Sequence, residues 1–376
     1  MSAWLPRTRR QWLAIPVGVA ALVACLLLGL FGDPKQTLLS YLFAFFFFTG
    51  LSVGSLALLM VHTLTGGAWG WYIRAPLLAA ARALPLMAIA LIPILLCLHT
   101  LYMWAQPAAW VHDPVLRQQS WYLATAFFVV RSVAYFALWI GWLFAFTRNL
   151  DDPLRAPRWA ASGLIVYALI SLVASVDWVV SLTPRWHSST FGMMVGTGWI
   201  LAAMALAVAV STRAHDPGDV ATSALHDLGG LLMALVLAWS YLAFMQYLTI
   251  WIADLPDENS WYIPRTLTSW RWLAWFLIAF HFLIPLVLLL SRGAKRRRLW
   301  MRNLAMMLVA ANLADAFWLV VPSFRAHGFA LRWSDLFAPL GLGALWWCVY
   351  VGQLRVARAA MPARFEDALA MERTDG

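Results

Sequence analysis

Charged residues are scarce in this chain. Asp, Glu, Lys and Arg together make up 12% of its 376 residues, whereas soluble domains average about 25%. Hydrophobic residues account for 63%. Because so few charges cannot cover the surface of a soluble protein of this length, the composition excludes an ordinary soluble enzyme and indicates a protein embedded in a lipid bilayer.

Cysteine is also rare, and nucleotide-binding motifs are missing. Cys25, Cys97 and Cys348 stand in separate apolar stretches, and their spacing suits no iron–sulfur cluster, c-type haem or zinc ion. The sequence contains neither a Walker loop nor a glycine-rich dinucleotide turn. We therefore expect no cofactor bound by this chain, so that any redox centre belongs to a partner protein or to a lipid-soluble molecule.

Long apolar runs are abundant instead. Ten of them are close to the roughly 20 residues that a helix needs to cross the hydrocarbon core. They cover approximately residues 12–31, 38–61, 78–103, 120–146, 159–182, 188–211, 228–252, 269–290, 303–321 and 335–353. Continuous runs lack the alternation of barrel strands, so we predict an all-α integral membrane protein with ten transmembrane helices. No small-residue cleavage site follows the first run, which we expect to be a retained helix.

The net charge of +10 is unevenly distributed along the chain. If the N-terminus is cytoplasmic, the cytoplasmic segments hold 18 Lys and Arg and the opposite side holds seven. The positive-inside rule therefore predicts a multi-pass protein of the bacterial inner membrane with both termini in the cytoplasm. The same distribution argues against nucleic-acid binding, and it makes the run 295–298 a topology anchor in contact with membrane lipids.

Local patterns recur four helices apart. The matches are, in order, Gly50-x3-Gly54 with Gly192-x3-Gly196, His99-x4-Trp104 with Gln246-x4-Trp251, Arg131 with His281, and Asp177-x6-Pro184 with Asp315-x6-Pro322. They predict two tandem four-helix bundles, helices 2–5 and helices 6–9, flanked by helices 1 and 10. The corresponding segments are 1–36 (cytoplasmic N-terminus and helix 1), 37–186, 187–325 and 326–376 (helix 10 and cytoplasmic tail). We expect the glycine pairs to permit close helix contact.

Ionisable side chains stand inside several of the predicted helices. A charge at bilayer depth costs roughly 2.5–3.5 kcal/mol even on a lenient scale, so it rarely persists without a partner or a function. Partly buried carboxylates and imidazoles can exchange protons near neutral pH, whereas arginine only holds a charge. The candidate proton pathway comprises Arg131, Asp177, Asp315 and His281, with Tyr241 and Gln246 as hydrogen-bonding relays. His99 and Tyr135, which shares the face of Arg131, are candidates for contact with a quinone headgroup.

Three other interpretations use the same residues. Arg131 and one of the two aspartates could form a buried ion pair that only fixes helix packing, as in a purely structural assembly subunit. The internal repeat alone would suit a stand-alone solute or ion carrier, but the sequence shows no glycine- or proline-interrupted helix pair at mid-membrane. Two histidines could hold a haem b, but His99 lies further out than His281.

From about residue 40 to residue 325 the chain resembles the NrfD-like (polysulfide-reductase-type) membrane subunits of respiratory complexes. Within that family it is most similar to the quinone-binding subunit 2 of alternative complex III, a quinol:cytochrome c oxidoreductase. The resemblance rests on Leu64–Gly70 with Arg74 and Pro76, Leu84–Leu86, Leu101, Tyr102, Trp104, Arg131, Tyr135, Phe136, Trp139, Asp177–Leu182, Pro184, Trp186, Ser189–Gly192, Asp227–Gly229, Tyr241–Phe244, Gln246, Tyr247, Trp251, Leu255, Pro256, His281, Phe282, Pro285, Ser291, Arg292, Asp315, Trp318 and Pro322.

The resemblance implies a duplicated four-helix bundle and an assembly with several partners. These are a sister NrfD-like subunit, an iron–sulfur subunit and haem c subunits, which carry electrons from quinol or menaquinol to cytochrome c or to a terminal oxidase. The sister subunit is the expected quinol site, so we expect this chain to contribute an intramembrane proton pathway and a scaffold to quinol oxidation and electron transport.

The chain departs from the family pattern at three positions. Thr183 stands where the pattern has an acidic residue, Gly230 where it has Asn, and Asn312 where it has Arg. The last change removes an expected partner of Asp315. We therefore expect Asp315 to be either more easily protonated or paired elsewhere.

Overall fold

The computed structural model describes residues 9–106, 110, 114–214 and 219–359. This part of the chain contains ten helices that are long and apolar enough to cross a membrane, and it contains no β-strand. The prediction of an all-α protein with ten such helices is confirmed. The first residues and the tail after residue 359 lie outside the described part.

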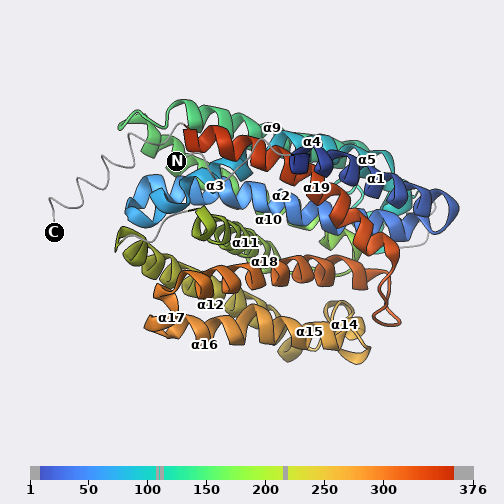
Figure 1. The fold of residues 1–376 in the computed structure, drawn as a ribbon. Helices are drawn as coiled ribbons and strands as arrows, with labels where there is room; N and C mark the ends of the chain where they lie inside the picture. The colour runs from blue at the N-terminus through green and yellow to red at the C-terminus, as the bar shows by residue number, and fades with distance from the viewer. Residues whose placement is uncertain (1–8, 107–109, 111–113, 215–218, 360–376) are drawn as a thin grey trace.

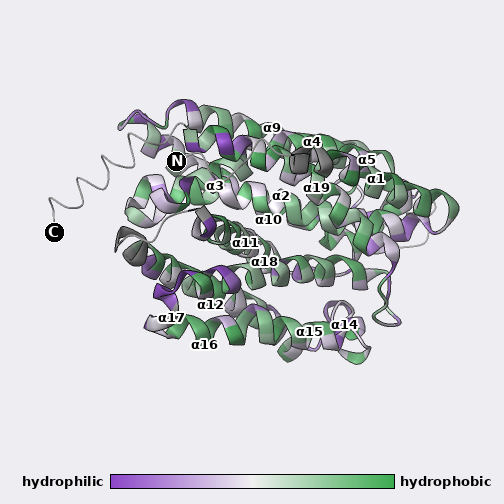
Figure 2. Ribbon diagram, viewed as in Figure 1, coloured by the Kyte–Doolittle hydropathy of each residue, from purple (hydrophilic) through white to green (hydrophobic). Residues whose placement is uncertain are grey.

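Eight of the ten spans consist of one main helix (Figure 1). These helices are α1 (Arg9–Phe31), α2 (Pro34–Thr65), α9 (Thr125–Arg148), α10 (Arg155–Trp178), α11 (Phe191–Ala214), α12 (Asp219–Ala253), α18 (Arg298–Val320) and α19 (Trp333–Ala359). Short segments occupy the connections, namely η1 (Met103–Ala105), α8 (Pro114–Gln118), η2 (Val180–Leu182), α13 (Pro256–Asn259), α14 (Ile263–Leu267), α17 (Arg292–Arg296) and η4 (Val321–Ser323). Hydrophilic residues gather mainly toward the ends of the bundle, with apolar residues along its length (Figure 2).

The third and eighth spans are interrupted. The third consists of α3 (Ala68–Ala81), α4 (Leu84–Ala90) and α5 (Ile92–Leu96), and the short helix α6 (Leu98–Leu101) follows it. Pro85 and Pro93 lie in the first turns of α4 and α5, where a proline leaves no intrahelical hydrogen bond unmade. The eighth consists of α15 (Arg271–Leu277), the π-helical segment η3 (Ile278–Leu283) and α16 (Ile284–Leu290).

Local sequence sets the ends of α2. The Asp33 carboxylate accepts a hydrogen bond from the backbone N–H of Gln36 at 3.0 Å, and Pro34 follows at the first helical position. Gly66, with φ of 68°, ends the helix by donating its N–H to the carbonyl of His62 at 2.8 Å. A residue with a Cβ would adopt this conformation only at a cost.

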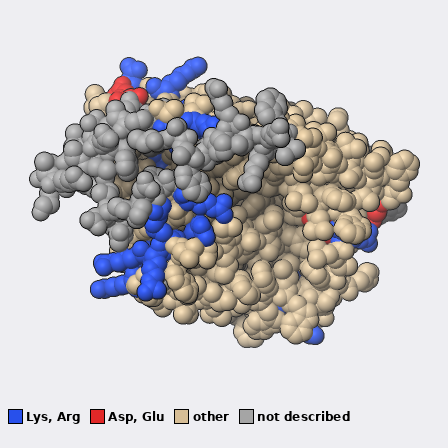
Figure 3. Space-filling model, in the orientation of Figure 1, with Lys and Arg blue, Asp and Glu red and all other residues tan. Residues whose placement is uncertain are grey.

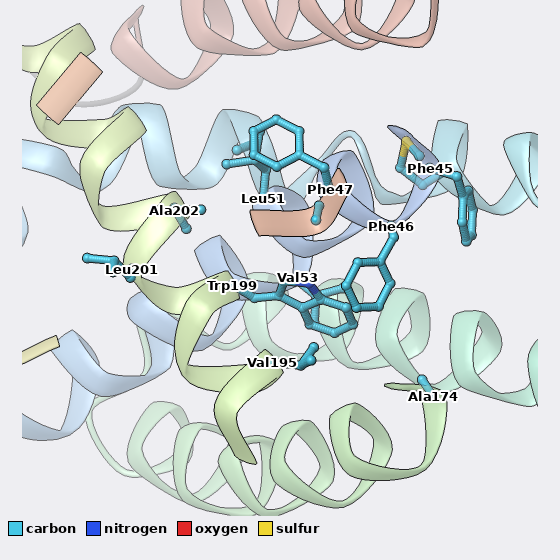
Figure 4. Close-up of a cluster of buried hydrophobic side chains, with 14 of the residues drawn as sticks. Phe45, Phe46, Phe47, Leu51, Val53, Ala174, Val195, Trp199, Leu201 and Ala202 are labelled. Atoms are coloured by element: carbon cyan, nitrogen blue, oxygen red, sulfur yellow. The ribbon is translucent and has the colours of Figure 1, made fainter. Parts of the chain in front are cut away.

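Helices α2 and α11 form the centre of the molecule. Most of each span is buried, 94% of the α2 window and 72% of the α11 window. Helix α2 contacts α3, α10, α11, α18 and α19, and α11 contacts α10, α12 and α18. At their crossing, a Cβ added to Gly54 would lie 2.3 Å from the carbonyl oxygen of Trp199, and the Trp199 ring packs against Phe46 (Figure 4).

Equivalent helices of the two predicted bundles make equivalent contacts. Helix α2 packs on α3 and α10, and α9 packs on α10; correspondingly, α11 packs on α12 and α18, and the eighth span packs on α18. This agreement supports the duplication, although the tandem bundles themselves stay a prediction. Helix α1 lies on α19, and α19 lies on α2 and α3.

The glycine pairs lie at close helix contacts, as expected. Gly50 and Gly54 face Trp199 of α11, whereas Gly192 faces Leu172 of α10. Under the predicted repeat, α2 corresponds to α11 and α10 corresponds to α18. Equivalent contacts would therefore place the glycine pair of α11 against α2, or the glycine pair of α2 against α18. These two pairs therefore have a packing role but do not themselves argue for duplication.

Basic residues gather at one end of the bundle (Figure 3). The connections at residues 66–67, 149–154 and 291–297 lie at this basic end, and its basic residues include Arg148, Arg155 and those of the run 292–298. It is the end that the positive-inside rule assigns to the cytoplasm.

Candidate functional site

Arg131 of α9 and Asp177 of α10 form a buried ion pair. Two guanidinium nitrogens of Arg131, Nε and one Nη, each donate to a different carboxylate oxygen at 2.9 Å. The other Nη donates to the carbonyl of Tyr122 at 2.8 Å, and the Tyr135 hydroxyl donates to Asp177 at 2.5 Å. The Asp177 side chain is fully buried. A bidentate pair with a third donor fixes the orientation of this carboxylate.

Aromatic rings enclose the guanidinium of Arg131. Its central carbon lies 4.0 Å from the ring centroid of Tyr122 and 4.3 Å from that of Phe127. Rings in such contact attract a cation and exclude water from it. The pairing that the sequence left open is thus with Asp177 and not with Asp315.

Asp315 of α18 has a different environment. It is buried, and within the described residues it forms no ion pair. It lines a cavity of about 20 Å³ between α2, α11 and α18, together with Asn312, Gly198 and Trp199, which leaves room for about one water molecule. The amide of Asn312 donates to the backbone carbonyl of Leu308 at 2.9 Å. Among the described residues, no other cation pairs with Asp315 in place of the arginine that the resemblance leads us to expect at position 312.

His281 lies in the π-helical segment of the eighth span. Its side chain is completely buried, and neither ring nitrogen has a hydrogen-bond partner among the described residues. The imidazole packs on the indole of Trp239 from α12, with ring centroids 3.9 Å apart. The indole N–H of Trp239 has no hydrogen-bond partner among the described residues. Its ring lies close to the Asp315 cavity, because a Cβ added to the lining residue Gly198 would lie 3.4 Å from it. Trp239 therefore contacts the imidazole and lies near the Asp315 cavity. π-Helical turns of the kind that carries His281 are frequent at functional sites.

Trp239 was missed by reasoning from the sequence. It is one of 24 tryptophans in the chain, and nothing in its local pattern separates it from those that anchor helices at the membrane surface. The π-helical turn was missed as well, although Pro285 a turn later is a signal of irregular geometry.

The remaining predicted site residues are divided between the interior and the surface. Gln246 is buried, donates to the Tyr262 hydroxyl at 3.1 Å, and accepts from Ser188 at 3.2 Å. Tyr241, in contrast, is 61% exposed on α12 and does not join the Asp315 cluster. His99 is also exposed, whereas Tyr135 belongs to the Asp177 site.

A buried arginine, Arg265, binds backbone carbonyls at the end of the molecule opposite the basic end. The Arg265 guanidinium donates to the carbonyls of Trp261 at 2.7 Å and Leu319 at 2.9 Å, the latter near the end of α18. It lies 3.5 Å from the Trp261 ring centroid, and Trp186 stacks on Trp261 at 4.7 Å. A cation at the C-terminal end of α18 satisfies carbonyls that the helix leaves without partners.

A second buried ion pair holds α19 against α2. Arg325 binds both carboxylate oxygens of Asp335 at 2.8 Å, and it donates to Gln36 of α2 at 2.6 Å. The hydroxyl of Ser40, also on α2, donates to Asp335 at 2.6 Å. Because all four side chains are buried, this network fixes the last helix in place. Sequence reasoning placed Arg325 between the predicted helices and Asp335 at the start of the run 335–353, and it did not pair them.

The described residues contain no group of three or more His, Cys, Asp or Glu side chains that could hold a metal ion. No protein-family model matches the chain, and no curated protein matches it either. The resemblance to the NrfD-like family therefore rests on the residues quoted above.

Proposed function

We propose that this chain is an integral membrane subunit of a quinol-oxidising respiratory complex, and that Asp315, Trp239 and His281 form the proton-carrying part of its interior. The observation that carries the proposal is the contrast between the two intramembrane aspartates. Asp177 is bound by a cation and a phenol, whereas Asp315 is buried beside a small cavity with no cation against it in the described residues.

The contrast has a direct chemical consequence. The Asp177 carboxylate is occupied by three donors. The Asp315 carboxylate borders a cavity with room for a water molecule that could exchange a proton with it. His281 supplies a second titratable group on the segment η3, which packs on α18. A water molecule in the cavity would bridge polar atoms that do not touch directly.

Both the resemblance and the fold support the rest of the proposal. The ordered residues between positions 40 and 325 resemble those of NrfD-like subunits, which work beside a sister subunit, an iron–sulfur subunit and haem c subunits. The ten helices that are long and apolar enough to cross a membrane suit a membrane subunit of such a complex, in which electrons from quinol would travel through these partners. The Arg131–Asp177 and Arg325–Asp335 networks would make the chain a rigid scaffold for them.

The test compares two isosteric variants in the assembled complex, Asp315→Asn and Asp177→Asn. We expect Asp315→Asn to assemble normally and to lower proton release per quinol oxidised, because the amide cannot titrate. We expect Asp177→Asn to lower the yield of assembled complex, because it leaves Arg131 without its partner. Asp257→Asn, in an exposed connection, is the matched control and should change neither quantity. Wild-type proton release and turnover in Asp315→Asn would overturn the proton pathway.

A purely structural subunit is the second candidate, and the Arg131–Asp177 pair favours it. In that case every charge substitution in the interior should reduce assembly, and complexes that do assemble should turn over at the wild-type rate. The ratio of turnover to assembled complex therefore separates the two functions.

A stand-alone carrier receives less support. The interrupted spans are the third and the eighth, which do not correspond under a repeat of four helices, whereas carrier sites are built from breaks in corresponding helices. Purification of the tagged chain in mild detergent distinguishes this case. Co-purifying haem c and iron–sulfur subunits support the respiratory proposal, and a colourless chain that comes out alone contradicts it.

A further inference from the structure

Arginines of two helices meet where α11 ends and α18 begins, at the basic end of the molecule (Figure 3). Arg298, the first residue of α18, donates through one Nη to the backbone carbonyl of Thr212 at 3.0 Å. In the opposite direction, one Nη of Arg213 on α11 lies 3.3 Å from the sulfur of Met306 on α18. The two contacts hold the end of α11 against the first turns of α18.

A third arginine lies between these two contacts. Arg298, Arg302 and Met306 follow one another at intervals of four residues on α18, and residues four apart are neighbours on a helix surface, with Cβ atoms about 5–6 Å apart. Because Arg298 contacts the end of α11 and Met306 contacts Arg213, Arg302 lies on the same side of α18. We call Arg213, Arg298 and Arg302 the arginine cluster.

No negative charge neutralises the arginine cluster within the described residues. None of its three members forms an ion pair there, and the Nε atoms of Arg298 and Arg302 are buried without a hydrogen-bond partner. The contact of Arg213 is with an uncharged sulfur. Arg131 and Arg325, in contrast, each bind a carboxylate. Like charges held together repel one another, so an anion from outside the chain would stabilise this part of the molecule.

Exposed apolar side chains lie beside the arginine cluster and continue from it along α18. Leu299 is 58% exposed and Met306 is 46% exposed, and Ala310, one turn after Met306, is exposed as well. The apolar span of α18 begins at Arg298. Arginines at the end of such a span place their charged groups at the depth of the lipid phosphates, with their stems along apolar surface. A membrane lipid therefore presents an anion to the cluster most directly.

We propose that the arginine cluster binds the headgroup of an anionic phospholipid with two phosphates, as diphosphatidylglycerol has. Guanidinium groups bind phosphate oxygens through pairs of parallel hydrogen bonds. Arg213 and Arg302 bind the phosphates, Arg298 holds α11 and α18 together, and the acyl chains lie along the exposed apolar face of α18. Two phosphates neutralise the cluster more fully than one does. The site lies about 20 Å along α18 from Asp315, and it does not depend on the proposed proton pathway.

The test measures lipid binding to the full chain, purified in detergent, by native mass spectrometry. The probes are diphosphatidylglycerol, phosphatidylglycerol and phosphatidylcholine with the same kind of acyl chain. We expect diphosphatidylglycerol to bind about fivefold more tightly than phosphatidylglycerol and about tenfold or more tightly than phosphatidylcholine, whose own ammonium group cancels its phosphate charge. Equal affinity for the three lipids, or no difference between the two anionic ones, overturns the proposal.

Two double variants with the same loss of charge locate the site. Arg213→Gln with Arg302→Gln should lower the affinity for diphosphatidylglycerol about tenfold and leave that for phosphatidylcholine unchanged. Arg292→Gln with Arg296→Gln changes two exposed side chains of α17 at the same end of the molecule and should bind as the wild type does. If this control weakens binding as much as the cluster variant, the lipid responds to the charge of the whole basic end and the arginine cluster is not its site.

A single variant covers the case in which the cluster variant is unstable. If its thermal midpoint falls, Arg213→Gln alone is measured, because this side chain is exposed and its replacement leaves the buried groups in place. The affinity for diphosphatidylglycerol should then fall about threefold. An unchanged affinity contradicts the proposal.

The deacylated headgroup, bis(glycerophospho)glycerol, identifies the source of the phosphates. We expect it to compete with diphosphatidylglycerol only at concentrations far above those of the lipid, because the acyl chains contribute to binding. A headgroup that binds as tightly as the lipid would show that the cluster takes its phosphates from a soluble molecule, and it would overturn the assignment to a membrane lipid.

Discussion

Arg131 and Asp177, 46 positions apart in the chain, meet through two hydrogen bonds of 2.9 Å each. The pair occupies the first of the two predicted bundles, and its counterpart in the second bundle is missing. There Asp315 has Asn312 one turn away and no cation against it in the described residues. The matching aspartates of the two predicted bundles therefore have opposite environments, since Asp177 is ion-paired and Asp315 is not.

Removing one partner of the first pair should destabilise the protein strongly. Asp177→Leu leaves the guanidinium of Arg131 buried without a counter-charge, which typically costs about 3–5 kcal/mol. We expect a large fall in thermal midpoint in detergent. The double variant Arg131→Met with Asp177→Leu should recover much of it, because two apolar groups need no partner. A double variant as unstable as the single one would show that the pair contributes more than mutual neutralisation.

The corresponding change at Asp315 should behave differently. Asp315→Asn leaves no buried cation without a partner, so the free energy of unfolding should change by no more than about 1 kcal/mol. The measurement is the thermal midpoint, with Asp177→Asn in the same detergent as the comparison. If the thermal midpoint falls equally in both variants, Asp315 must have a stabilising partner outside the contacts described here.

Helix α2 should tolerate no side chain at Gly54. The Cβ of Gly54→Ala would lie 2.3 Å from the Trp199 carbonyl oxygen, which belongs to the backbone and cannot rotate away. Overpacking of this kind costs about 1–3 kcal/mol, so the thermal midpoint should fall. Gly141→Ala is the control, because nothing lies within 4 Å of its added Cβ. Equal midpoints for the two variants would mean that α2 and α11 can separate easily.

The attachment of α19 should depend on Asp335. Asp335→Asn removes the negative charge that pairs with Arg325 through two hydrogen bonds of 2.8 Å, and it weakens the hydrogen bond from Ser40. Hydrogen exchange in the first turns of α19 should become faster, while exchange in α11 stays unchanged. Uniform acceleration across both helices would show instead that the network supports the whole fold and not α19 alone.

Acid should loosen the start of α10 before the rest of the bundle. Backbone N–H groups, that of Arg155 first, hold the pKa of the Asp152 carboxyl below its ordinary value. A depressed pKa in the folded protein means that the stabilisation is complete above the pKa of the unfolded chain and is lost as the pH falls through the folded pKa. Hydrogen exchange over residues 155–158 should accelerate in that window, and Asp152→Asn should abolish the pH dependence. A variant with the wild-type acid response would assign it to another group.

Much of the site was visible in the sequence as single residues. Arg131, Asp177, Asp315 and His281 stand out because ionisable groups are costly in apolar helices, and all four are buried or nearly so. Their partners were not visible. Trp239 has no distinguishing pattern, and Tyr241 shares its helix with Gln246 but lies on the exposed side. A helix of apolar residues on every face gives no indication of which face turns inward.

The sequence by itself determined that the chain is helical, that it has ten apolar spans, and that a few polar groups lie within them, because each of these properties depends on local composition and run length. Only the tertiary structure decided which groups meet. Arg131 pairs with Asp177, Arg325 pairs with Asp335, and Asp315 pairs with no cation in the described part of the chain. Such pairing depends on how the helices pack. The free energies that separate alternative packings of apolar helices come from contacts between positions far apart in the sequence.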